Sequence, residues 1–138
     1  MNDMEDRIMT TKETIIKVLE RMGYRPEIDD DGDIYFWYQM KAIYVLTNDK
    51  DDYVSIMLPQ FYDIDEGQEA LVMTVCNKLT REMKMIKVFV DQTFKSVTGT
   101  CEFFYSSEEI FEQNMARTLE VFGVLRTLFR LKKKELES

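Results

Sequence analysis

The chain has no histidine, so it lacks the side chain that most often serves as general base, proton shuttle or metal ligand near neutral pH. Acid–base chemistry would then need a carboxylate, lysine or tyrosine with a strongly shifted pKa, and no spacing suggests one. The two cysteines, Cys76 and Cys101, are not at metal-ligand spacing. A nucleophilic cysteine would also lack its usual base. We therefore expect a protein that is not an enzyme and has no catalytic residues, metal site or cofactor.

Long apolar runs and an excess of positive charge are also missing. The longest apolar stretch, residues 70–76, is interrupted by Thr74 and is far shorter than the roughly 20 residues of a membrane span. The 26 acidic residues outnumber the 18 basic ones, which gives a net charge of −8 and disfavours nucleic acids and anionic membranes as partners. Residues 1–6 are acidic where a signal peptide begins with positive charge, so we expect a cytoplasmic protein.

The residues that are present describe a globular chain. At 138 residues, with 45% hydrophobic and 32% charged side chains, it is long enough for one domain around one core, and we expect a single domain over residues 1–138. In a reducing compartment Cys76 and Cys101 serve as small buried apolar residues; a disulfide between them is the less favoured alternative.

The first half predicts a helix followed by an antiparallel meander. Thr10 and Glu13 form a capping box for a helix over residues 11–22, which Gly23 ends. Short strands are expected over residues 24–28, 33–40, 42–47 and 53–58, the last of them stopped by Pro59. Polar turns separate these strands, and the connections are too short for a parallel crossover.

The second half predicts helix, hairpin, helix. Asp65 is the expected N-cap of a helix over residues 66–83, and the hairpin strands are expected over residues 85–91 and 97–105. Ser106 or Ser107 then caps a long closing helix. The order α-β-β-β-β-α-β-β-α predicts an α+β domain with an antiparallel sheet backed by helices.

The predicted strand over residues 33–40 is apolar on both of its faces. In a strand, successive side chains point to opposite faces of the sheet. Ile34, Phe36, Tyr38 and Met40 would therefore lie on one face, and Tyr35 and Trp37 on the other. A sheet with one solvated face should instead alternate apolar and polar residues. Either both faces are covered within the monomer, or something else covers one of them.

The closing helix has the same excess of apolar surface. One stripe consists of Phe111, Met115, Leu119, Phe122 and Phe129, and it is widened by Val121, Val124, Leu125 and Leu128. A single core contact needs an apolar arc only a little over ~100° wide. The helix is either buried on two sides in its own domain or carries a surface for self-association or a partner. The candidate partner or ligand surface comprises Tyr35, Trp37, Tyr44, Val121, Val124 and Leu128.

Two neighbouring segments of the chain resemble the YbjN-type family. They are Cys-Asn-Lys-Leu-Thr-Arg-Glu over residues 76–82 and Met-Ile-Lys-Val-Phe-Val-Asp over residues 85–91. That bacterial family, for which a role in sensory transduction has been proposed, has the type III secretion chaperone-like fold. Its pattern is a helix with an asparagine, a short basic turn and a strand of the form x-K-V-x-x-D. The resemblance implies a non-enzymatic, protein-binding domain in a fold where homodimers are common.

The acidic segment 27–34 resembles the start of a calcium loop, with acids at alternate positions and Gly32 sixth. The twelfth position should be a bidentate glutamate, but it is Tyr38, and the flanking residues predict strands. We therefore interpret this segment as a solvated hairpin turn.

The leading functional hypothesis is a cytoplasmic, chaperone-like or regulatory protein-interaction domain that forms a homodimer and binds an unidentified protein partner. The alternative is a small-ligand-binding domain with a pocket between sheet and helices, lined by Tyr35, Trp37 and Tyr44.

Overall fold

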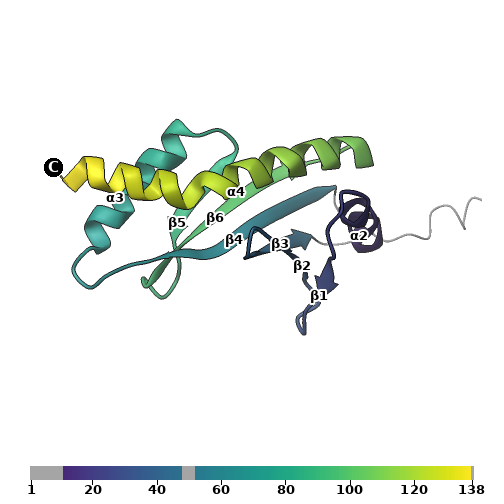
Figure 1. Cartoon of the computed structure of the whole chain (residues 1–138), viewed down its shortest axis with the longest axis horizontal. Coiled ribbons are helices and arrows are strands. Elements are labelled where there is room, and N and C mark those ends of the chain that lie inside the picture. The colour runs from purple at the N-terminus through teal and green to yellow at the C-terminus, as the bar shows by residue number, and fades with distance from the viewer. Residues whose placement is uncertain (1–10, 48–51, 138) are drawn as a thin grey trace, which may run out of the picture.

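Helices cover one face of a single six-stranded antiparallel sheet in the computed structural model, which describes residues 11–47 and 52–137 (Figure 1). The elements are α2 (Thr11–Arg21), β1 (Glu27–Ile28), β2 (Ile34–Tyr38), β3 (Lys41–Thr47), β4 (Tyr53–Asp63), α3 (Glu69–Glu82), β5 (Ile86–Val90), β6 (Ser96–Phe104) and α4 (Glu108–Glu137). The strands lie in the order β1-β2-β3-β4-β6-β5. This confirms the element order and the α+β class expected from the sequence.

Two helix ends follow the predicted capping chemistry. Gly23 has a φ of +100° after α2, and the Tyr24 N–H donates to the Leu19 carbonyl at 3.0 Å, as in a Schellman motif. At the start of α4 the Ile110 N–H donates to Ser107 Oγ at 3.1 Å, so Ser107 is the cap. The predicted capping box depends on Thr10, which lies outside the described residues.

The predicted N-cap of α3 is wrong. The helix begins at Glu69 after Gln68, three residues later than expected. A turn comes first, in which Gly67 has a φ of +87° and the Gln68 N–H donates to the Asp65 carbonyl at 3.0 Å. Because the left-handed φ of Gly67 is incompatible with a continuing helix, Asp65 lies in this turn and does not cap α3.

The predicted end of β4 at Leu58 is also wrong, because the strand continues through Pro59 to Asp63. The β4–β6 register shifts between Leu58 and Tyr62, and Gln60, with a φ of +50°, donates its N–H to Thr98 Oγ1 at 3.1 Å. Proline is tolerated here because the bulge does not require its missing N–H.

The core lies between the sheet and the helices α2, α3 and α4. Alternate strand residues face the helices, among them Ile34, Phe36, Ile43, Val45, Val54, Ile56, Val88 and Cys101. Above them α4 buries the six aromatic or large apolar side chains Phe111, Met115, Leu119, Phe122, Leu125 and Phe129. Figure 1 shows α4 running along the sheet, with α3 beside it and next to β5.

Candidate functional site

The sheet face that points away from α2 and α4 is rich in aromatic and apolar side chains, and no described helix covers it. We call it the open face, and it contains Tyr35, Trp37, Ala42, Tyr44, Leu46, Tyr53, Met57 and Phe104. Its two most exposed members are Trp37, at 60% of its surface, and Phe104, at 70%. Exposed apolar patches of this kind are typical of interaction sites.

Cross-strand pairs hold the open face in one arrangement. Tyr35 and Tyr44 are register partners whose rings stack with centroids 5.5 Å apart, and Tyr53 and Phe104 lie 5.3 Å apart. The negative charge of Glu27 raises the pKa of Tyr35. A hydrogen bond with Glu102 likewise raises the pKa of Tyr53. Both phenols therefore stay neutral at physiological pH, whereas the neighbouring Glu102 is charged and paired with Lys87.

A cavity of about 430 Å³ lies at the β1–β2 end of the open face. Its apolar lining comes from Tyr44, Leu46, Met57 and Pro59, and the carboxylates of Asp29, Asp31 and Asp33 lie along it, within 4.8 Å of one another. Asp29 Oδ1 accepts the N–H groups of Asp31 and Asp33, each at 2.9 Å. These bonds form the hairpin turn expected from the sequence.

The small-ligand alternative placed its pocket on the wrong face of the sheet. Ile34 and Phe36 point into the core, so alternation directs Tyr35 and Trp37 to the opposite face, away from the helices. Met40 was expected to share the face of Phe36. It lies instead in the β2–β3 turn with a φ of +66° and is 95% exposed.

The expected residues of the closing helix form a second surface, separate from the open face. Leu125 is buried, Val121 and Leu128 are half-buried, and Val124 is 50% exposed. Leu131, which was not among the residues expected from the sequence, is 59% exposed and extends this row. Its heptad spacing from Val124 was the signal that could have found it. We call Val121, Val124, Leu128 and Leu131 the α4 stripe.

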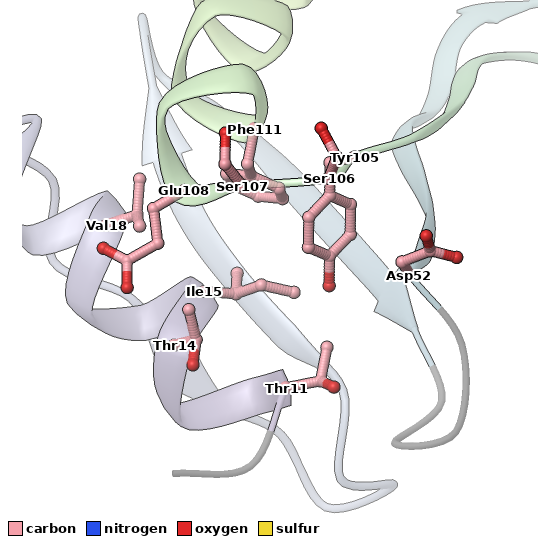
Figure 2. Close-up of a pocket in the computed structure, with 10 residues that line it drawn as sticks. All are labelled: Thr11, Thr14, Ile15, Val18, Asp52, Tyr105, Ser106, Ser107, Glu108 and Phe111. Atoms are coloured by element: carbon pink, nitrogen blue, oxygen red, sulfur yellow. The ribbon is translucent and has the colours of Figure 1, made fainter. Parts of the chain in front are cut away.

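A cavity of about 360 Å³ lies between α2 and the start of α4 (Figure 2). Its ten lining residues include Thr11, Thr14, Ser106 and Ser107, two carboxylates, and the apolar side chains of Ile15 and Phe111. Burial raises the pKa of Tyr105, whose ring lies 5.3 Å from that of Phe111. No histidine, cysteine or lysine is among these ten residues, so Asp52 and Glu108 are the groups beside the hydroxyls that could accept a proton.

The two cysteines are free thiols inside the core. Burial raises the pKa of Cys76 to about 12 and that of Cys101 to about 11. Both thiols remain protonated at neutral pH, whereas nucleophilic chemistry requires the thiolate. They therefore act as apolar packing residues.

None of the described helices is long and apolar enough to cross a membrane.

Two solved structures have the same fold. YbjN from E. coli matches with a TM-score of 0.63 at 10% identity, over 88% of this chain and 90% of that one. An uncharacterized protein from Methanothermobacter thermautotrophicus matches with a TM-score of 0.57 at 15% identity, over 90% of this chain and 97% of that one. At such low identity the likeness concerns the fold alone.

No curated protein sequence gives a significant match. A family model does match, over residues 10–127, and its description is "T3SS (YopN, CesT) and YbjN peptide-binding chaperone 1". The match runs from the start of α2 to the middle of α4, so it includes the whole sheet. The chain therefore belongs to the family of type III secretion and YbjN peptide-binding chaperones.

Proposed function

We propose that this protein binds segments of other proteins on its open face, in a chaperone-like or regulatory role in the cytoplasm. One observation carries the proposal: aromatic and apolar side chains on four neighbouring strands, from Trp37 on β2 to Phe104 on β6, without a described helix over them. The description of the family as peptide-binding supports the same role.

The geometry favours recognition through side chains. The central strands β3, β4 and β6 already pair on both sides, so their backbone groups are used within the sheet. A bound segment would lie across the open face and bury its apolar side chains against Trp37, Tyr44 and Phe104. Each square ångström of apolar surface removed from water contributes roughly 25 cal/mol. The net charge of −8 disfavours nucleic acids and anionic membranes as competing partners.

Trp37 gives this proposal a built-in reporter, because it is the only tryptophan of the chain and lies on the open face. We expect reduced, carboxymethylated lactalbumin fragments without tryptophan to shift its emission to shorter wavelength on binding. Phe104→Ser should weaken this binding at least tenfold. Leu131→Ser removes a similarly exposed side chain from the α4 stripe and should leave the affinity unchanged. An unshifted emission, or equal affinities for the two variants, would count against the open face as the binding site.

The proposal includes a homodimer formed through the α4 stripe. Its residues follow the spacing i, i+3, i+7 and i+10, which is that of a coiled-coil seam. In an antiparallel pair of α4 helices, Val121 would face Leu131 of the second copy, and Val124 would face Leu128. Such a dimer would leave the open face of each copy accessible, because the stripe lies on the helical side of the sheet.

A further inference from the structure

A cavity of about 290 Å³ lies where the bulge of β4 meets the start of β3 and α4, and we call it the bulge cavity. Part of its lining is apolar and nearly closed to water, since Leu58 and Phe61 are only 2% and 8% exposed. Three charged side chains also line it: Lys41, Asp63 and Arg126. Its volume is at the lower end of the ~300–1,000 Å³ typical of small-molecule sites, so it suits a ligand of few atoms.

The two cations of the bulge cavity come from distant parts of the chain. Lys41 begins β3, directly after the turn in which Gln39 and Met40 have φ angles of +49° and +66°. That turn lies against α4, because a Cβ placed on Gly123 would be 3.2 Å from Gln39 Oε1. Arg126 follows Gly123 by about one helical turn and lines the same cavity as Lys41. The fold thus brings two positive groups together in a chain with a net charge of −8.

The bulge of β4 adds polar groups at the same place. Gln60, which has a φ of +50°, is exposed and lines the cavity, and Asp63 lies at the end of the strand. Left-handed backbone at a residue other than glycine is uncommon, and bulges often redirect side chains beside functional sites. The bulge therefore presents an amide and a carboxylate to the cavity that holds the two cations.

The three charges of the bulge cavity are not used within the protein. The ion pairs between described residues do not involve Lys41, Asp63 or Arg126. Asp63 pairs with neither cation, although all three side chains line one cavity. A ligand there would meet two positive groups, one negative group and an apolar wall.

We propose that the bulge cavity binds a free α-amino acid with an apolar side chain. The carboxylate of this ligand would lie between Lys41 and Arg126, in charge-assisted hydrogen bonds. Its ammonium group would pair with Asp63, and its side chain would lie against Ala42 and Pro59. A dianion such as phosphate fits less well, because the carboxylate of Asp63 would repel it.

The bulge cavity differs from the open face in its chemistry. It borders that face at Ala42, but its three charged side chains are not among the residues of the open face. A free amino acid is also a different class of ligand from a segment of a protein. The proposal therefore stands whether or not the open face binds protein segments.

Three small probes test the proposal on the full chain, with the backbone amide signals in NMR spectra as the readout. L-leucine carries both charges, N-acetyl-L-leucine lacks the positive charge, and L-leucinamide lacks the carboxylate. We expect L-leucine to bind with a dissociation constant of about 1 mM or lower, roughly tenfold more tightly than either of the others. The signals of Lys41, Ala42 and Gln60 should shift, because these residues line the cavity.

Variants then assign the charges. Lys41→Gln/Arg126→Gln should remove the preference for L-leucine over L-leucinamide, because no positive group would remain for the carboxylate. Asp63→Asn should remove the preference over N-acetyl-L-leucine and keep the preference over L-leucinamide. The control is Arg117→Gln/Arg130→Gln, the same loss of charge at exposed positions of α4 outside the cavity, and it should keep both preferences. Circular dichroism should show that all three variants are folded.

Three results would overturn the proposal. The first is that none of the probes shifts the signals of the cavity, or that all three bind equally. The second is that N-acetyl-L-leucine binds as tightly as L-leucine, because the cavity would then recognise a carboxylate alone, such as the C-terminus of a protein. The third is an equal loss in the two double variants, which would show attraction by overall charge instead of binding in the cavity.

Discussion

At the scale of single residues, burial decides the chemistry of the two thiols. Cys76 is 5% exposed and Cys101 is fully buried, so neither side chain can be hydrated as a thiolate. The pKa of each is raised well above 9.0, its ordinary value. In the unfolded chain both thiols return to water and ionise near that ordinary value.

The raised thiol pKa values predict a loss of stability in alkaline solution. The contribution of each thiol is fully present below its unfolded pKa and is lost as pH rises towards its folded pKa, because the unfolded state ionises first. We expect the free energy of unfolding in urea to fall between about pH 9 and pH 11 more steeply for the wild type than for Cys76→Ala/Cys101→Ala. Parallel pH profiles for the two proteins would contradict this, since lysines and tyrosines titrate in both.

The acidic turn leads to a second prediction at the residue scale. Asp29, Asp31 and Asp33 lie close together, but Asp29 Oδ1 already accepts two backbone N–H groups, and the twelfth position of the calcium pattern is Tyr38 in β2. We expect calorimetric titration with calcium to give no dissociation constant below about 10⁻⁴ M. That threshold is the tight end of the range for extracellular calcium modules. Asp31→Asn serves as the control and should change nothing. A tighter signal that this variant removes would refute the interpretation as a plain turn.

At the scale of elements, α4 packs against β6 at a position where the strand has no side chain. A Cβ placed on Gly99 would lie 2.7 Å from Leu125 Cδ2 and 3.7 Å from atoms of Ile86 and Phe61. A side chain at position 99 would therefore require Leu125 to move. Phe129 adds to this contact, with ring centroids 5.7 Å from Phe61 and 4.5 Å from Tyr62.

Overpacking this contact should destabilise the fold. We expect Gly99→Val to lower the free energy of unfolding by about 1–3 kcal/mol, as extra methyl groups do in a filled core. Leu125→Ala alone should cost about 2–5 kcal/mol through the cavity it leaves. The double variant should lose less than the sum of the two, because valine fills the space that leucine vacated. If the losses in unfolding free energy of the two single variants add up to that of the double variant in chemical denaturation, the side chains at positions 99 and 125 do not contact each other.

At the scale of the whole molecule, the layer arrangement leaves apolar surface on several sides. Helices lie on one face of the sheet only, so the open face has no cover among the described elements (Figure 1). The α4 stripe lies on the opposite side of the molecule, and the exposed side chains of Met73 and Phe94 lie at the edge of the sheet, between α3 and the β5–β6 hairpin. Three separated apolar surfaces on one small domain suit a protein that works by contact with other chains.

The oligomeric state tests the α4 stripe. We expect a dimer by light scattering, and Leu128→Glu should give a folded monomer, because the charge would lie in the seam. Phe122→Ala should instead unfold or strongly destabilise the domain: Phe122 is fully buried, and its truncation costs about 3–5 kcal/mol. That is a large part of the ~5–15 kcal/mol by which a domain is stable. A strictly monomeric wild type at high concentration would remove the dimer from the proposed function.

The sequence by itself determined the order and type of the elements, because apolar periodicity and caps are local properties. Gly23 ends α2 and Ser107 begins α4 as predicted, since each acts on backbone groups only a few residues away. The same local reasoning failed at Asp65 and Pro59. The neighbouring Gly67 turn displaces the start of α3, and pairing with β6 carries β4 past its proline.

Only the tertiary structure decided which apolar surfaces are covered. Alternation separated Tyr35 and Trp37 from Ile34 and Phe36, but it could not tell which pair would face the helices. That choice depends on the side of the sheet over which α4 returns, which is set by contacts between residues far apart in the chain. The apolar surface around Met73 and Phe94 likewise combines α3 with the β5–β6 hairpin, so its residues share no sequence pattern. Local chemistry fixes each element, whereas long-range packing fixes what remains exposed for a partner.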